Sequence, residues 1–374
     1  MYDYIIIGAG TAGCVLASRL SEDPQVKVLL LEAGGPDKKQ EIAVPAAFPK
    51  LFKTEFDWGY ETEPQERLKG RKIFWPRGKT LGGSSSINAM VYSRAHPTDH
   101  DLMASLGLDG WGYADVLPYY RRSEKNERWS NEYHGTDGPL CVSDLRCVNQ
   151  LTHLFVEAAG EAGIPRTEDF NGAQYEGAGC FQVTQKDGRR HSAADAFLKP
   201  ALNRDNLTAL TGAHVTRVVI EGGRASGVEY VKDGATQRQV CNREVILSGG
   251  TINSPQLLML SGIGPADELM KHGVRVAADL PGVGRNLQDH QLIGVEFECR
   301  EPVGLHKADN LRNILNFMLF HKGPLTSNVA EAGAFIRTRP DLRLPDVELV
   351  FAPVFYMDNG FSNPDLHGFS IGIA

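Results

Sequence analysis

The chain has 374 residues, 42% of them hydrophobic, and a formal net charge of −7. This length allows two domains with sizeable cores, and the acidic balance leaves no basic surface for nucleic acid, so nucleic-acid partners are not expected. The six cysteines show neither the CxxC spacing of a metal or redox site nor the density of a disulfide scaffold. No metal site is expected.

The cellular location is read from the N-terminus and the longest apolar runs. The first predicted strand begins at Tyr2, which leaves no room for a signal peptide. The longest apolar runs, such as residues 314–320, are far shorter than the roughly 20 residues that span a bilayer. We therefore expect a cytoplasmic protein without a transmembrane segment, with peripheral contact to the inner membrane as a further option.

Residues 2–20, YDYIIIGAGTAGCVLASRL, predict a short buried strand, a glycine turn and a helix. Gly8, Gly10 and Gly13 match the G-x-G-x-x-G pattern in the context that this pattern requires. Gly8 makes the tight turn, Gly10 lets a pyrophosphate reach the backbone, and Gly13 lets the helix pack on the strand. The helix N-terminus adds free N–H groups and a partial positive charge for the diphosphate.

A second predicted strand ends at Glu32, which lies 24 positions after Gly8. An acid near this spacing accepts hydrogen bonds from an adenosine ribose and disfavours a 2′-phosphate. Strand, turn, helix and acid together favour a dinucleotide site over a purely structural turn. The pattern does not separate NAD from FAD, because both carry the same ADP half.

The middle of the chain contains further strand and glycine signals. Residues 214–250 predict three strands joined by EGGR and KDGAT turns and followed by a buried strand, a layout typical of FAD domains. A helix is expected next, with Ser254 as its N-cap and Pro255 at its first position. Gly249 and Gly250 precede it and mark another place where backbone can approach a ligand.

Residues 78–90, GKTLGGSSSINAM, are either a flexible linker or a loop that lies against a large flat ligand. With the following residues to 95 they resemble the first motif of the glucose-methanol-choline (GMC) family of FAD oxidoreductases. Residues 250–264 resemble the second motif, and residues 282–290 resemble a third family segment. The resemblance covers essentially the whole chain and is greatest to bacterial choline dehydrogenases and acceptor-dependent alcohol dehydrogenases.

The resemblance implies FAD as cofactor and assigns flavin contacts to the motif loop. The backbone at Val215 matches the position that reads the adenine edge, and Ile87 stands where some members carry a His that tethers the flavin. An isoleucine forms no such bond, so non-covalent FAD is expected. The implied contacts in the motif loop are Gly82, Gly83, Asn88, Ala89, Met90 and Val91.

The implied activity is oxidation of an alcohol to an aldehyde or ketone by hydride transfer to flavin N5, with electrons passed to a quinone or another acceptor. The alternatives are a flavin-containing hydroxynitrile lyase of the same family and an inactive FAD-binding fragment. The family's catalytic His pair is expected beyond Ala374, so no catalytic residue is assigned and the 374-residue chain alone is expected to be inactive. Glu331 matches a substrate-cavity position, with a buried, paired acid as the alternative.

The histidines present are expected to be structural residues or to lie at the surface. His290 is expected to be buried, whereas His134, His191 and His367 are expected at the surface. The implied fold is α/β: a doubly wound, Rossmann-like FAD-binding domain with a β-meander, interlaced with an α+β substrate domain on an antiparallel sheet and incomplete at the C-terminus. The expected ranges are 1–45 and 203–296 for the FAD-binding domain, 70–95 for the motif loop, and 96–202 and 297–374 for the substrate domain.

Overall fold

The computed structural model describes residues 1–362 and 364–374. The chain forms two compact units that alternate along the sequence. Unit 1 consists of Met1–Lys39, Leu51–Asn88 and Ser192–Asp289, and unit 2 consists of Gln40–Lys50, Ala89–His191 and His290–Ala374. The assignment of an FAD-binding domain and a substrate domain to the ranges given above stays a prediction.

Unit 1 is built on a six-stranded sheet with the order β10-β2-β1-β13-β12-β11. The first four strands are parallel, and β12 and β11 extend the sheet in antiparallel pairing. This is the predicted Rossmann-like sheet with its meander, and the predicted third meander strand and the buried strand after it are one continuous element, β13. The bounds are β1 (Tyr2–Ile7), β2 (Val28–Leu31), β10 (Leu207–Leu210), β11 (His214–Glu221), β12 (Arg224–Lys232) and β13 (Ala235–Leu247).

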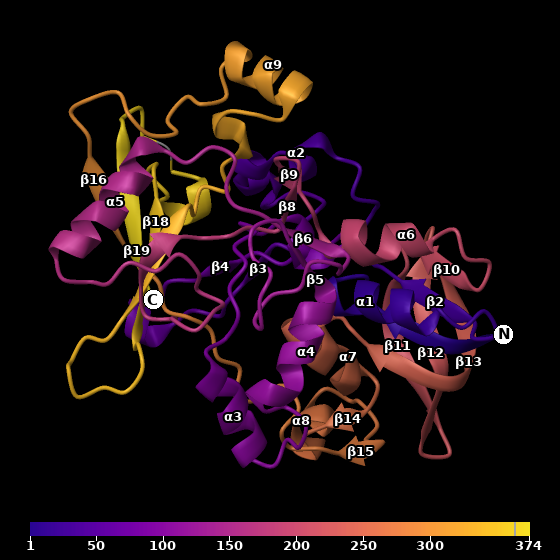
Figure 1. The fold of residues 1–374 in the computed structure, drawn as a ribbon. Helices are drawn as coiled ribbons and strands as arrows, with labels where there is room; N and C mark the ends of the chain where they lie inside the picture. Colours follow the sequence, from indigo (N-terminus) through magenta and orange to yellow (C-terminus); the bar gives the residue numbers. More distant parts are fainter. Residues whose placement is uncertain (363) are drawn as a thin grey trace. The chain divides into compact units, whose positions relative to one another are not determined.

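The core of unit 1 forms around its parallel strands. All four residues of β2 are buried, as expected for a parallel strand that is covered on both faces. Ile5 and Ile7 of β1 pack with Leu29 and Leu31 of β2 in one apolar cluster. Helix α1 (Thr11–Leu20) follows β1 and packs beside β2 (Figure 1). The glycine turn is therefore flanked by two elements, β1 and α1, that are both held by packing in unit 1.

Helix α7 (Gly250–Leu260) begins earlier than the sequence suggested. The prediction that it starts at Pro255 is wrong, because Gly249 is the N-cap and Pro255 lies inside the helix. Proline lacks an N–H, so this position loses one bond to the carbonyl of Thr251 near the start of the helix, a loss that the helix tolerates. The other short elements of unit 1 are α6 (Lys199–Ala201), α8 (Ala266–Lys271), β3 (Tyr60–Glu61), β4 (Phe74–Trp75), β14 (Ile263–Gly264) and β15 (Ala278–Asp279).

Unit 2 is built on a five-stranded antiparallel sheet with the order β16-β19-β18-β17-β7, as predicted. Helix α5 (Gln150–Glu161) packs on it, with Val156 against Ala332 and Phe351, and Ala159 against Ala178. The strands are β7 (Gly177–Cys180), β16 (Ile293–Glu298), β17 (Ala332–Ile336), β18 (Val347–Ala352) and β19 (Gly368–Ile373).

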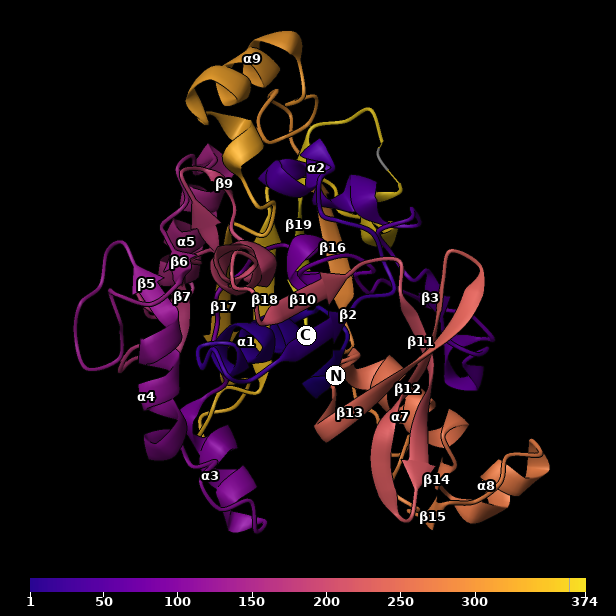
Figure 2. The same cartoon turned by 90° about the vertical axis from the view of Figure 1, so that its right-hand side faces the viewer.

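The remaining elements of unit 2 are short strands and peripheral helices (Figure 2). Among residues 1–362 and 364–374, no helix combines the length and the apolar composition needed to cross a membrane. The bounds are α2 (Gln40–Ala43), α3 (Pro97–Ser105), α4 (Tyr113–Ser123), α9 (Leu311–Phe320), β5 (Glu124–Asn126), β6 (Leu140–Val142), β8 (Gln185–Lys186) and β9 (Arg189–Arg190).

Candidate functional site

A cavity of about 670 Å³ lies in unit 1 at the carboxyl ends of its parallel strands. Ile7, Leu31 and Leu247, the last residues of β1, β2 and β13, all line it. Open α/β sheets bind ligands at this edge, and ligand pockets usually measure about 300–1,000 Å³. The position and the size of the cavity both suit a cofactor.

The glycine turn after β1 forms one wall of this cavity. A Cβ on Gly8, whose φ is +95°, would lie 2.6 Å from the carbonyl oxygen of Ser248, and one on Gly13 would lie 1.9 Å from the oxygen of Gly8. Those two glycines are required by the packing of the turn itself. Gly10 differs, because its Cβ would meet only the oxygen of Ser248, at 3.9 Å. Since Gly10 lines the cavity, its missing side chain leaves room for a ligand.

Two helix N-termini face the same cavity. Thr11 and Ala12 of α1 line it, as do Gly250 and Thr251 of α7. Neither helix has a side chain that caps its first N–H groups. Unpaired N–H groups and the positive end of the helix dipole attract anions, so the two first turns can hold the charged oxygens of a diphosphate.

Glu32 holds the glycine turn and also lines the cavity. One carboxylate oxygen accepts a hydrogen bond of 2.8 Å from the N–H of Ala9, and the other accepts one of 2.8 Å from the N–H of Gly34. Burial raises the pKa of Glu32, whereas the two hydrogen bonds and the charge of Lys79 oppose that rise. Each carboxylate oxygen retains a further lone pair, so Glu32 can also accept a hydrogen bond from a ribose hydroxyl.

The motif loop of residues 78–90 packs directly on the glycine turn. A Cβ on Gly83 would lie 2.7 Å from the Cα of Gly10. The N–H of Gly82 donates a hydrogen bond of 2.8 Å to the carbonyl oxygen of Ala9. Gly83 and Ser84 line the cavity. The glycines of this loop therefore serve a close backbone approach, and the loop is not a flexible linker.

The cavity brings together some of the predicted cofactor residues and leaves others outside it. Among the described residues, its lining includes Gly8, Gly10, Glu32, Gly83 and Val215 but not Gly13, Gly82, Asn88, Ala89, Met90 or Val91. Gly13 and Gly82 belong to the packing of the turn and the loop, as described above.

The residues that follow Gly83 in the motif loop have different surroundings. Asn88 is exposed, Met90 is buried with a φ of +57°, and Val91 pairs with Val183 inside unit 2. Their contact with the flavin stays a prediction.

Sequence reasoning missed an aromatic group on the cavity wall. The rings of Trp58 and Tyr60 are stacked with centroids 5.8 Å apart, and the ring of His214 meets Trp58 edge-on at 5.6 Å. The hydroxyl of Tyr60 donates a hydrogen bond to Oδ1 of Asn253 in α7. All four side chains belong to residues that line the cavity. The W-x-Y spacing at residues 58–60 is the one local signal that could have indicated them.

Ser248, at the end of β13, provides a further test of whether the cavity suits a polar ligand. Its buried Oγ has no hydrogen-bond partner among the described residues, and Ser248 lines the cavity. Buried hydroxyls are normally paired, so an unpaired one indicates a missing polar partner. Together with the glycine turn, the two helix N-termini and Glu32, it shows that the residues present fit a dinucleotide such as FAD.

Glu331 is fully buried inside unit 2. One carboxylate oxygen accepts hydrogen bonds from the N–H of Asn149, at 2.8 Å, and the hydroxyl of Thr152, at 2.6 Å. The other accepts one of 2.6 Å from the hydroxyl of Ser327. Burial raises the pKa of Glu331, and these bonds oppose the rise. The carboxylate links the start of α5 to the segment before β17, while its contact with a substrate stays a prediction.

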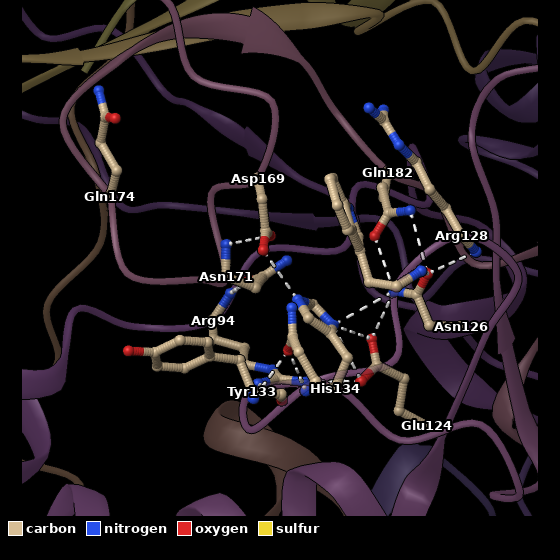
Figure 3. A network of polar contacts seen from close by, with 12 residues as sticks. Arg94, Glu124, Asn126, Arg128, Tyr133, His134, Asp169, Asn171, Gln174 and Gln182 are labelled. Atoms are coloured by element: carbon tan, nitrogen blue, oxygen red, sulfur yellow. Dashed lines mark hydrogen bonds and ion pairs between the residues drawn. The ribbon is translucent and has the colours of Figure 1, made fainter.

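The histidines do not lie where the sequence placed them. His134 was expected at the surface but is buried in a polar network of unit 2, where its imidazole lies between Glu124 and Asp169 (Figure 3). His290 was expected to be buried and is exposed, and His191 and His367 are half-buried. Burial depends on distant segments, here the carboxylates at 124 and 169, which the local sequence around a histidine does not reveal.

Known proteins resemble this chain over most of its length. The family model described as GMC oxidoreductase matches residues 2–292. The chain is 47% identical over 371 residues to mitochondrial choline dehydrogenase of Mus musculus, covering 96% of this chain and 62% of that protein. It is 45% identical over 385 positions to alcohol dehydrogenase (acceptor) of Pseudomonas putida, covering 100% of this chain and 69% of that protein.

A solved structure is also similar to this chain. Pyridoxine 4-oxidase from Mesorbium loti superposes with a TM-score of 0.89 at 35% identity, over 100% of this chain and 71% of that chain. The chain belongs to the GMC oxidoreductase family. This membership supports FAD as the cofactor, while its placement in the unit 1 cavity stays a prediction.

Proposed function

We propose that the protein oxidises an alcohol to an aldehyde or ketone, with FAD held in the unit 1 cavity, and passes the electrons to a quinone or another acceptor. The observation that carries this proposal is the packing of Gly83 on Gly10 beside Glu32, at the carboxyl ends of the parallel strands. The substrate class is supported by relatives that are named choline dehydrogenase and alcohol dehydrogenase (acceptor).

Each part of the cavity has a proposed task. The first turns of α1 and α7 hold the diphosphate through backbone N–H groups, and Glu32 accepts a hydrogen bond from the adenosine ribose. The aromatic side chains of Trp58 and Tyr60 and the backbone of Val215 surround the adenine. When bound, FAD supplies a hydride acceptor at N5 of its ring system.

The FAD is proposed to be bound without a covalent link. Ile87 occupies the position at which tethered members of the family carry a histidine, and its side chain is buried. An aliphatic side chain offers no nucleophile for a bond to the flavin. Affinity must then come from the hydrogen bonds, helix termini and packing of the cavity.

The test is anaerobic reduction of the bound flavin by an alcohol, in a form of the protein that includes the segment expected to carry the catalytic His pair, because residues 1–374 alone are expected to be inactive. Choline, benzyl alcohol and a medium-chain primary alcohol are added in turn, and at least one is expected to bleach the flavin absorbance. Tert-butanol is the matched control, because its carbinol carbon has no hydrogen to lose. Flavin that stays oxidised with every alcohol would contradict the proposal, and cleavage of a cyanohydrin by that same protein would support a hydroxynitrile lyase instead.

A further inference from the structure

Helix α9 in unit 2 directs its apolar face away from the protein. Leu311, Ile314, Leu315, Met318 and Leu319 are 37–72% exposed. Their spacing places them on one side of the helix, the side that a surface helix normally turns toward the core. Both overall views show α9 standing away from the five-stranded sheet (Figures 1 and 2). The helix is therefore amphipathic, but its apolar side faces away from the protein and not toward the core.

The opposite side of α9 fixes this orientation. Phe317 is the buried residue of the helix. The side chain of Asn310 caps the helix by accepting a hydrogen bond of 3.1 Å from the N–H of Asn313, whose own amide donates one of 2.9 Å to the carbonyl of Ala308. The cap at Asn310 and the burial of Phe317 fix the rotation of the helix, so its apolar face points outward.

The charge of α9 and of the segment that follows it differs from that of the whole chain. Residues 311–330 contain no Asp or Glu but contain Arg312 and Lys322, in a chain with a net charge of −7. Both cations are exposed, and the described part of the chain shows no ion-pair partner for either. An exposed apolar stripe accompanied by unpaired cations is the pattern of helices that bind anionic bilayers.

We propose that α9 docks the protein on an anionic lipid bilayer. The helix lies in the plane of the interface, with the five apolar side chains among the acyl chains and with Arg312 and Lys322 at the level of the headgroups. Ten residues extend for only about 15 Å, so the helix rests on the membrane and does not span it.

A second copy of the chain suits this surface less well than a bilayer. In a symmetric dimer both subunits use the same patch, so two apolar patches that each carry unpaired cations would face each other. Residues 311–330 supply no acid that could pair with them. A lipid-docked protein would also reach a lipid-soluble quinone, and only this last consequence rests on the proposed function.

The experiment is flotation of the purified protein with vesicles. Wild-type protein is expected to float with vesicles of phosphatidylcholine and phosphatidylglycerol, and less with phosphatidylcholine alone. The double variant Leu315→Glu/Met318→Glu is expected to bind at least about tenfold more weakly, because two inserted side chains become anions. Arg312→Gln/Lys322→Gln is expected to lose the preference for phosphatidylglycerol.

The matched control is Leu102→Glu/Leu106→Glu, which changes two exposed leucines at α3 in the same unit. It should float like the wild type. The proposal is overturned if wild-type protein binds neither kind of vesicle, or if Leu315→Glu/Met318→Glu floats as the wild type does. A dimer that the same double variant dissociates, without vesicle binding, would assign the face to a second copy. Flavin content and alcohol oxidation are measured separately, so failure of docking is distinct from failure of the proposed activity.

Discussion

The carboxylate of Glu32 accepts a hydrogen bond of 2.8 Å from the backbone N–H of Ala9, in the centre of the glycine turn. A second bond, from the N–H of Gly34, engages its other oxygen. Both oxygens are thus acceptors for backbone donors at a buried position. This geometry makes Glu32 a support for the turn in addition to its proposed contact with the ribose.

Replacing Glu32 by Gln tests this double role. The amide group would present N–H hydrogens to a backbone N–H, so we expect the free energy of unfolding to fall by about 1–3 kcal/mol. The affinity for FAD should fall as well. Urea unfolding and FAD titration measure the two effects, with the exposed Glu244→Gln on β13 as the control. Unchanged stability in Glu32→Gln would show that the backbone bonds contribute little.

The polar network of unit 2 predicts a stability change at alkaline pH. Burial alone would lower the pKa of His134, but hydrogen bonds to Asp169 and Glu124 outweigh it and raise the pKa to about 9. The folded pKa lies above the unfolded value of about 6.5, so this stabilisation is full below about pH 6.5 and is lost as the pH rises through about 9. It amounts to about 3 kcal/mol at most.

His134→Gln is the variant that isolates this contribution. Between about pH 6.5 and 9, the free energy of unfolding should fall more steeply in the wild type than in the variant. The network also lowers the pKa values of Glu124 and Asp169 despite their burial, so their contribution is lost at acid pH instead. Parallel pH profiles of the two proteins in the alkaline range would contradict a charged His134.

Glu331→Gln separates a structural role of this buried acid from contact with the substrate. The structure leads us to expect a loss of about 1–3 kcal/mol in the free energy of unfolding, because an amide cannot accept all three hydrogen bonds. In a form that includes the segment expected to carry the catalytic His pair, the KM values for choline and benzyl alcohol should then change in parallel. A KM that rises for choline alone would show that the carboxylate contacts a cationic substrate.

The absence of a nucleophile at Ile87 predicts how the flavin leaves the protein. After precipitation with acid or heat, the yellow colour should be in the supernatant, and chromatography should identify free FAD. A covalently held flavin would remain with the precipitated protein. Colour in the washed pellet would contradict non-covalent binding and redirect attention to other side chains near the motif loop.

The turn from β1 to α1 could be predicted because its signals are local. The buried strand, Gly8, Gly10 and Gly13 lie within a dozen residues, and Glu32 follows at the end of the next strand. The start of α7 could not be placed by the same means, because Pro255 resembles a first-turn residue although the helix begins at Gly250. Pro255 is the sixth of the eleven residues of α7, where it removes one helical hydrogen bond, and the rule that places proline in the first turn does not anticipate this position.

Features that depend on segments far apart in the chain could not be predicted from the sequence. The aromatic wall joins Trp58 and Tyr60 to Asn253, about two hundred positions later, through a hydrogen bond that no motif encodes. The burial of His134 likewise depends on carboxylates at 124 and 169. The outward face of α9 was visible as an apolar run, but its direction required the fold.

The most direct test of the account is FAD binding by Gly10→Val. A Cβ at this position would meet only the carbonyl oxygen of Ser248, at 3.9 Å, so the side chain would be directed into the space assigned to the diphosphate. We expect Gly10→Val to fold with near wild-type stability and to lose FAD binding in a fluorescence titration, whereas the control Gly160→Val, at an exposed and open position of α5, keeps it. A folded Gly10→Val protein that retains stoichiometric FAD would contradict the placement of the cofactor in this cavity.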